Sequence, residues 1–150
     1  MDKIKRLVLV TTALLFISCK TTKLETASGR PEIDVRDKLG LEIRRGLNHF
    51  MTDRGYLVWS SDDLTMAFDK EASKWATLRY GSLIDSETWV RMEFSIIQLE
   101  PFSYRVIASP LIVTDRGSSF ESAEPLKGQH LKEAQVVLDE FGAYLSTQGI

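Results

Sequence analysis

Two segments of the chain, one near each end, carry apolar residues at every third or fourth position, which is the spacing of an amphipathic helix. The first predicts a helix over residues 34–53, with Asp34 as its N-cap and Gly55 just beyond its end. Gly40 and Gly46 each weaken this helix by about 1 kcal/mol relative to alanine. Its apolar positions are Val35, Leu39, Ile43, Leu47 and Phe50 or Met51. The second has the most regular spacing and predicts a C-terminal helix through Leu131, Ala134, Leu138, Phe141 and Leu145.

Between these segments the pattern is that of β-strands. Apolar and polar side chains alternate over residues 88–99, which predicts a strand with one buried face and one wet face. Residues 104–114 form a second β-rich run, in which Pro110 indicates an edge position or a bulge. The short runs at residues 56–59 and 64–68 flank a turn-rich tetrapeptide and predict a hairpin. Residues 70–84, with Trp75 and Tyr80, fit either a strand or a short helix.

The order helix, about four strands, helix favours an α+β fold. Antiparallel strands joined by short turns, with one apolar face, need helices packed on that face. We therefore predict a two-layer sandwich of about four antiparallel strands, with an N-terminal and a C-terminal helix on one face. Residues 32–150 would form this single domain, and the Thr-, Ser-, Lys- and Gly-containing residues 19–31 would be a flexible tether.

The N-terminus has the parts of an export signal. Lys3, Lys5 and Arg6 precede an uncharged apolar run of eleven residues at positions 7–17. A helix of that length would reach about 16 Å, roughly half of the ~30 Å hydrocarbon thickness of a bilayer. The pattern predicts a cleaved signal peptide over residues 1–18 rather than a membrane span.

The run ends in Phe16-Ile17-Ser18-Cys19, which contains the only cysteine of the chain and resembles the lipobox of bacterial lipoproteins. In that family the cysteine thiol receives a diacylglyceryl group, a peptidase cleaves before the cysteine, and the new amine is acylated. Phe16 stands where the family usually has leucine. The resemblance implies that Cys19 is the lipidation site and the first residue of the mature protein. Several acyl chains, such as palmitate, make membrane attachment effectively permanent.

The residue after the cysteine bears on location. An aspartate at that position is associated with retention in the inner membrane of Gram-negative bacteria, whereas this chain has Lys20. For a Gram-negative source, the resemblance implies the outer membrane, with the domain facing the periplasm. Residues 113–121 and the polar loop and helix that follow them loosely resemble the ending of small envelope lipoproteins, which implies no activity. The alternatives are an ordinary secretory signal or a buried first helix with a free core cysteine.

Charge restricts the partners. Residues 1–18 carry three basic groups and one acidic group, so their removal lowers 19 basic and 21 acidic groups to 16 and 20, a net charge of −4. A mildly acidic domain has no positive field to attract nucleic acid or an anionic membrane surface. The acyl chains on Cys19 are then the only evident membrane contact, and an envelope protein remains a candidate partner.

Residue types that carry catalysis or bind metals are sparse. His130 and Glu133 lie three apart on the C-terminal helix without a further ligand or an HExxH motif, and His49 is expected to make a local hydrogen bond. Ser82 and Ser118 lack the G-x-S-x-G elbow of serine hydrolases, and no glycine-rich phosphate loop occurs. We therefore expect no catalytic residue, no metal and no cofactor.

Three groups of carboxylates are candidates for an acid/base pair or a calcium site, namely Asp62 with Asp63, Asp69 with Glu71, and Asp85 with Glu87. All three lie in segments that resemble turns, so solvated turn residues are the favoured interpretation. The aromatic residues of the middle of the chain are expected either to fill the core or to line a ligand cavity; they are Trp59, Phe68, Trp75, Tyr80, Trp89 and Phe94.

The favoured function is a membrane-anchored bacterial envelope lipoprotein with a non-catalytic binding or scaffolding domain. A carrier or sensor of a small apolar ligand, held between the sheet and the helices, is the first alternative. A hydrolase of envelope polymers is a disfavoured alternative, because it needs two carboxylates about 5–9.5 Å apart in a cleft. The presence or absence of a cavity separates the first alternative from a simply filled core.

Overall fold

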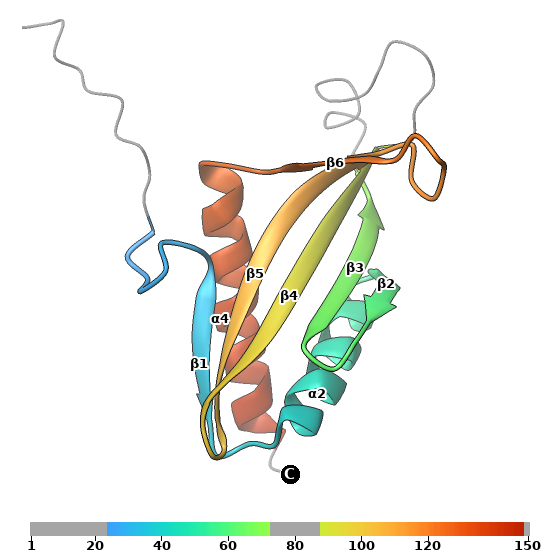
Figure 1. The fold of residues 1–150 in the computed structure, drawn as a ribbon. Helices are drawn as coiled ribbons and strands as arrows, with labels where there is room; N and C mark the ends of the chain where they lie inside the picture. Colours follow the sequence, from blue (N-terminus) through green and yellow to red (C-terminus); the bar gives the residue numbers. More distant parts are fainter. Residues whose placement is uncertain (1–23, 73–87, 149–150) are drawn as a thin grey trace, which may run out of the picture.

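The computed structural model describes residues 24–72 and 88–148 (Figure 1). Outside these ranges lie the predicted signal peptide, Cys19 and residues 73–84 of the ambiguous stretch. The elements are β1 (Glu32–Arg36), α2 (Gly40–Asp53), β2 (Leu57–Ser61), β3 (Thr65–Glu71), β4 (Thr88–Glu100), β5 (Ser103–Thr114), β6 (Ser122–Pro125) and α4 (Gln129–Thr147).

The strands form one antiparallel sheet of six strands in the order β1-β5-β4-β3-β2. Two strands share the edge of β5 that faces away from β4. β1 pairs with residues 103–107 and β6 pairs with residues 111–114. Both helices pack on the same face of the sheet, and a single hydrophobic core joins them to it (Figure 1). The predicted two-layer α+β sandwich is therefore confirmed, with six strands in place of about four.

The core lies between the helices and the sheet. The apolar positions of β4 that alternate in the sequence do face the helices, and Phe94 is fully buried there. Phe68 meets Phe94 edge-on with ring centroids 5.9 Å apart, and Phe50 meets Phe141 at 5.3 Å where the two helices meet. Each fully buried phenylalanine contributes roughly 1.5–3 kcal/mol through the hydrophobic effect.

Gly46 allows the two helices to approach each other. A Cβ atom at this position would lie 2.6 Å from Cδ2 of Leu145 on α4. The glycine that weakens the helical pattern of α2 in the sequence is therefore the residue that permits its tertiary contact. Helix propensity is a weak preference, and packing of this kind overrides it.

The start of α4 is tied to β1 by side-chain hydrogen bonds. The backbone N–H of Glu32 donates to Oε1 of Gln135 at 2.9 Å, and Nε2 of Gln135 donates to the backbone carbonyl of Glu32 at 3.0 Å. The Glu32 carboxylate in turn accepts a hydrogen bond from the backbone N–H of Ala27 at 2.9 Å. These bonds fix the position of α4 over β1 and β5.

The prediction of one helix over residues 34–53 is wrong at its beginning. Residues 32–36 form β1, and Val35 enters the core from a strand rather than from a helix. Arg105 on β5 donates two hydrogen bonds, of 2.7 and 3.0 Å, to the Asp34 carboxylate, which is therefore a cross-strand partner and not a helix cap. The helix begins at Gly40, where Glu42 accepts the backbone N–H of Leu39.

Pro110 lies where the edge of β5 that faces away from β4 is paired with no strand, which suits a residue without an N–H. It lies on β5 between the stretch paired with β1 and the stretch paired with β6, so its missing N–H leaves no ladder hydrogen bond unmade. Its carbonyl accepts the backbone N–H of Leu126 at 2.9 Å. The hairpin predicted from residues 56–68 is also present, as β2 and β3.

Candidate functional site

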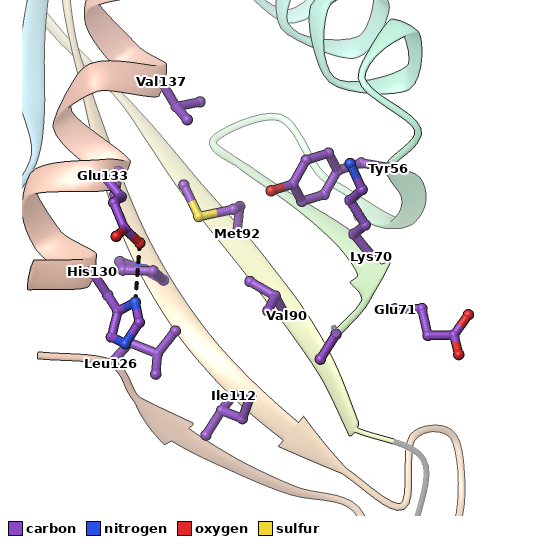
Figure 2. Close-up of a pocket in the computed structure, with 13 residues that line it drawn as sticks. Tyr56, Lys70, Glu71, Val90, Met92, Ile112, Leu126, His130, Glu133 and Val137 are labelled. Atoms are coloured by element: carbon purple, nitrogen blue, oxygen red, sulfur yellow. Dashed lines mark hydrogen bonds and ion pairs between the residues drawn. The ribbon is translucent and has the colours of Figure 1, made fainter. Parts of the chain in front are cut away.

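A groove lies on the helix-covered face of the sheet, between the first half of α4 and the end of β3 (Figure 2). We call it the α4 groove, and its volume is about 320 Å³. Its floor and apolar wall are formed by Ala72, Val90, Met92, Pro110, Ile112, Leu126, Ala134 and Val137. Its polar rim is formed by Tyr56, Lys70, Glu71, His130 and Glu133.

The groove exists because α2 ends before the sheet does. The helix stops at Asp53, and Gly55, with a φ of +79°, turns the chain into β2. A positive φ is readily adopted by glycine, so the chain reverses here at low cost. As Figure 1 shows, α2 covers β2 and β3 over only part of their length, so the groove floor is bordered by α4 on one side.

The floor of the groove is apolar because it continues the face of the sheet that forms the core. Val90 pairs with Ile112, and Met92 pairs with Pro110, across β4 and β5, and all four side chains belong to the face that the helices cover. The alternation of residues along β4 thus continues beyond the part of the sheet that α2 covers. The result is a hydrophobic surface that is concave rather than filled, which is the usual form of a small-molecule site.

Tyr56 and Lys70 form one end of the rim. Nζ of Lys70 donates to the backbone carbonyl of Arg54 at 2.7 Å and lies 5.2 Å from the centre of the Tyr56 ring. Burial raises the pKa of the Tyr56 hydroxyl, which therefore stays neutral and able to donate. Within residues 24–72 and 88–148 this hydroxyl has no hydrogen-bond partner, and it points across the groove towards Met92 (Figure 2).

The other polar residues of the rim either bond to each other or point outward. Nδ1 of His130 and Oε2 of Glu133 are 3.1 Å apart and form an exposed pair on α4, as their spacing predicts. The Glu71 carboxylate points away from the groove (Figure 2). The groove therefore presents an apolar interior with one uncommitted donor, and this arrangement suits the binding of an apolar group.

The opposite face of the sheet carries a second cluster, which we call the Asp69 cluster. Asp69 is fully buried and accepts hydrogen bonds from Nε and Nη2 of Arg91 at 2.7 and 3.0 Å. It also accepts one from Nε of Arg116 at 2.6 Å. Glu121 accepts from Nη1 of Arg91 at 2.8 Å, so two arginines balance two carboxylates.

Two tryptophans cover the arginines of the Asp69 cluster. The guanidinium carbon of Arg91 lies 4.4 Å from the centre of the Trp59 ring. That of Arg116 lies 4.7 Å from the Trp59 ring and 4.3 Å from the Trp89 ring, so Arg116 is held between two indoles. Cation–π contacts of this kind strengthen when water is excluded. The hydrogen bonds of Asp69 raise the pKa of Arg91, whose charge is therefore permanent.

The cluster fixes the loop that leads from β5 to β6. The backbone N–H of Gly117 donates to Oε2 of Glu121 at 2.7 Å, and this bond, together with Arg91, lowers the pKa of the Glu121 carboxyl. Because Arg91 donates hydrogen bonds to both Asp69 and Glu121, these charges are already satisfied. We interpret the cluster as structural.

Several carboxylates that the sequence indicated lie elsewhere. Asp62 and Asp63 form the turn between β2 and β3, as predicted, and Asp63 pairs with Arg44 at 2.9 Å while remaining almost fully exposed. The placement of Asp69 and Glu71 in a turn is wrong, because both belong to β3, where Asp69 faces Arg91 across the strand pair. Asp85 and Glu87 lie outside the described residues.

The structure also places the aromatic residues and the histidine that the sequence singled out. Phe68 and Phe94 are core residues, whereas Trp59 is 40% exposed over the Asp69 cluster. His49 lines a separate hollow between α2 and α4. Among residues 24–72 and 88–148, no three histidine, cysteine, aspartate or glutamate side chains gather as a metal site would require. Cys19, Trp75, Tyr80 and Ser82 lie outside these ranges.

Comparison with known proteins adds no relative. No protein-family model matches the chain, and no curated protein matches it either. In the part of the chain that the structure describes, neither helix is long and apolar enough to span a bilayer.

Proposed function

We propose that this chain is a membrane-anchored bacterial envelope lipoprotein whose domain is a non-catalytic carrier of an apolar ligand. The observation that carries the proposal is the α4 groove, with its apolar floor and its volume of about 320 Å³. Ligand sites typically measure about 300–1,000 Å³ and combine apolar walls with a few polar groups. Of the two binding functions that the sequence leaves open, the groove favours a ligand carrier over a scaffold.

The anchor in this proposal is Cys19. It rests on the uncharged run before the cysteine, on Ser18, and on the absence of any other cysteine from the sequence. An anchored carrier stays close to the membrane, where apolar molecules are concentrated.

The anchor is tested by Cys19→Ala in the full chain. The parent chain should incorporate labelled palmitate and partition into detergent, whereas the variant should incorporate none and keep its signal peptide. Equal labelling of the two chains would contradict the proposed anchor and leave the groove as a separate question.

The groove is tested by displacing its volume. Every residue of the core lies between Val35 and Leu145, so residues 20–150 retain the whole domain without the anchor. These residues should bind the apolar fluorophore N-phenyl-1-naphthylamine with a saturable rise in fluorescence. Val90→Phe should weaken this binding by at least about fivefold by filling the groove, because overpacking a well-formed apolar site typically costs about 1–3 kcal/mol.

The matched control is Val136→Phe, the same substitution at an exposed position of α4 that does not line the groove. It should bind the fluorophore as the parent does. If the parent does not bind the fluorophore, or if both variants bind it equally well, the proposed carrier function fails.

A further inference from the structure

The shape of the α4 groove indicates a linear ligand. Along α4 the groove extends from His130 to Val137, which is about 10 Å at 1.5 Å per residue. A second hollow of about 500 Å³ shares Ile112, Leu126 and His130 with it and continues towards β6. A compact ring system needs a wide pocket, whereas a flexible chain can occupy a long groove of this kind.

The volume of the groove sets the length of such a chain. If a methylene group takes roughly the 30 Å³ that one water molecule takes in the liquid, then the 320 Å³ of the α4 groove, without the adjoining hollow, holds about ten of them. Each methylene transferred from water to an apolar site strengthens binding by about fourfold. Affinity should increase with chain length only until the groove is full, because the second hollow beyond it is lined in part by the polar residues Glu124, Lys127 and Gln129.

The rim indicates the polar group of the ligand. The Tyr56 hydroxyl points into the groove, and no described residue accepts its hydrogen bond. Nζ of Lys70 lies at the other end of the Tyr56 ring and donates to a backbone carbonyl. Glu133 is paired with His130, and Glu71 is turned outward. A head group with a carbonyl or carboxylate oxygen next to the chain would accept the proton of the Tyr56 hydroxyl.

We propose that the α4 groove binds a single linear acyl chain of about ten carbons, with its carbonyl or carboxylate oxygen hydrogen-bonded to Tyr56. This inference rests on the proposed carrier function and names the class of its ligand. The acyl group is supplied either by a free fatty acid or by a membrane lipid with one chain drawn into the groove.

The test is displacement of N-phenyl-1-naphthylamine from residues 20–150 by saturated carboxylates of six to fourteen carbons. Affinity should increase about fourfold per methylene up to about ten carbons and then level off. Naphthoic acid, which is apolar but not linear, should displace the fluorophore less well than decanoate. Affinity that does not depend on chain length, or better displacement by naphthoic acid, would overturn the assignment to an acyl chain.

Tyr56→Phe tests the head group and retains the ring that lies near Lys70. The variant should bind decanoate about fivefold more weakly, as expected for one lost hydrogen bond, whereas Val136→Phe should bind decanoate as the parent does. Unchanged binding of decanoate would overturn the role given to Tyr56.

Two further results identify the source of the acyl chain and distinguish failure of this inference from failure of the carrier function. Displacement by decanoate alone assigns a free fatty acid, whereas equal displacement by decanoyl lysophosphatidylcholine, used below its micelle concentration, assigns the acyl chain of a lipid. Binding of the fluorophore that Val90→Phe abolishes, but that no acyl compound displaces, would refute the ligand class and leave the carrier function standing.

Discussion

At the scale of single residues, Asp69 carries the most consequential electrostatic contacts. Its carboxylate is fully buried and accepts hydrogen bonds from both Arg91 and Arg116. A buried ion pair contributes little net stability compared with apolar residues of the same shape. Removing one partner is costly, however, because the remaining charge stays buried without compensation.

Asp69→Asn should therefore lower the free energy of unfolding by about 3–5 kcal/mol. The matched control is Asp63→Asn, which removes the exposed pair with Arg44 and should cost less than about 1 kcal/mol. Urea unfolding followed by tryptophan fluorescence measures both variants. Equal effects at the two positions would contradict the structural role of the Asp69 cluster.

Two other carboxylates make stability depend on pH. The backbone N–H of Gly117 lowers the pKa of Glu121, and the hydrogen bonds of Arg105 lower the pKa of Asp34. A carboxyl with a lowered pKa in the folded state stabilises the protein fully above its unfolded pKa, about 4 to 4.5. That contribution is lost as the pH falls through the folded pKa.

The free energy of unfolding should thus be nearly constant from pH 7 to about pH 5 and decrease below that. Glu121→Gln should be less stable than the parent at pH 7 and should lose less stability on acidification. Urea titrations at a series of pH values measure this slope. A variant with the same slope as the parent would show that Glu121 does not carry the effect.

The residues of the Asp69 cluster also show what a sequence pattern leaves out. Alternation along β4 assigns Arg91 to the wet face, and it does lie on the face away from the helices. Alternation does not reveal that Asp69, Trp59 and a distant loop cover that face and bury Arg91 to 5% exposure. The cluster joins residues from four parts of the chain, so the pattern within any one segment does not predict it.

At the scale of elements, the packing of α2 against α4 depends on Gly46. Gly46→Ala gains about 1 kcal/mol of helix propensity but forces the buried Leu145 side chain to move, which typically costs 1–3 kcal/mol. We expect a net destabilisation of roughly 1 kcal/mol.

Gly142→Ala on α4 is the control for Gly46→Ala, because its new Cβ would lie 3.5 Å from Cδ1 of Ile33, an ordinary contact. It should stabilise the protein by roughly 0.5–1 kcal/mol. Thermal and urea unfolding of the two variants give the comparison. Stabilisation by both substitutions would show that the two helices are not held at the distance the structure describes.

Long elements with one buried face were predictable, and short edge elements were not. The spacing of residues in α4 and the alternation in β4 both follow from burial on a single side. In contrast, β6 has only four residues, all exposed, so its sequence has no apolar pattern. β1 has five residues, and its one buried aliphatic residue, Val35, falls at a spacing that also fits the following helix.

At the scale of the whole molecule, the groove follows from a mismatch in length between α2 and the sheet. The helix ends at Asp53, and β3 and β4 continue beyond it with apolar residues on the same face. The sequence indicates a possible ligand between sheet and helices but not this place, because the mismatch exists only once the elements are packed. The anchor proposed at Cys19 would hold the groove close to a membrane.

The methionine methyl groups provide the most direct measurement of the central claim, which is that the α4 groove binds an acyl chain. Met92 lines the groove, whereas Met51 and Met66 lie in the core outside it. In residues 20–150 labelled with carbon-13 at the methionine methyls, decanoate should shift the Met92 signal saturably and leave the signals of Met51 and Met66 in place. A Met92 signal that does not move, or three signals that move together, would contradict the claim.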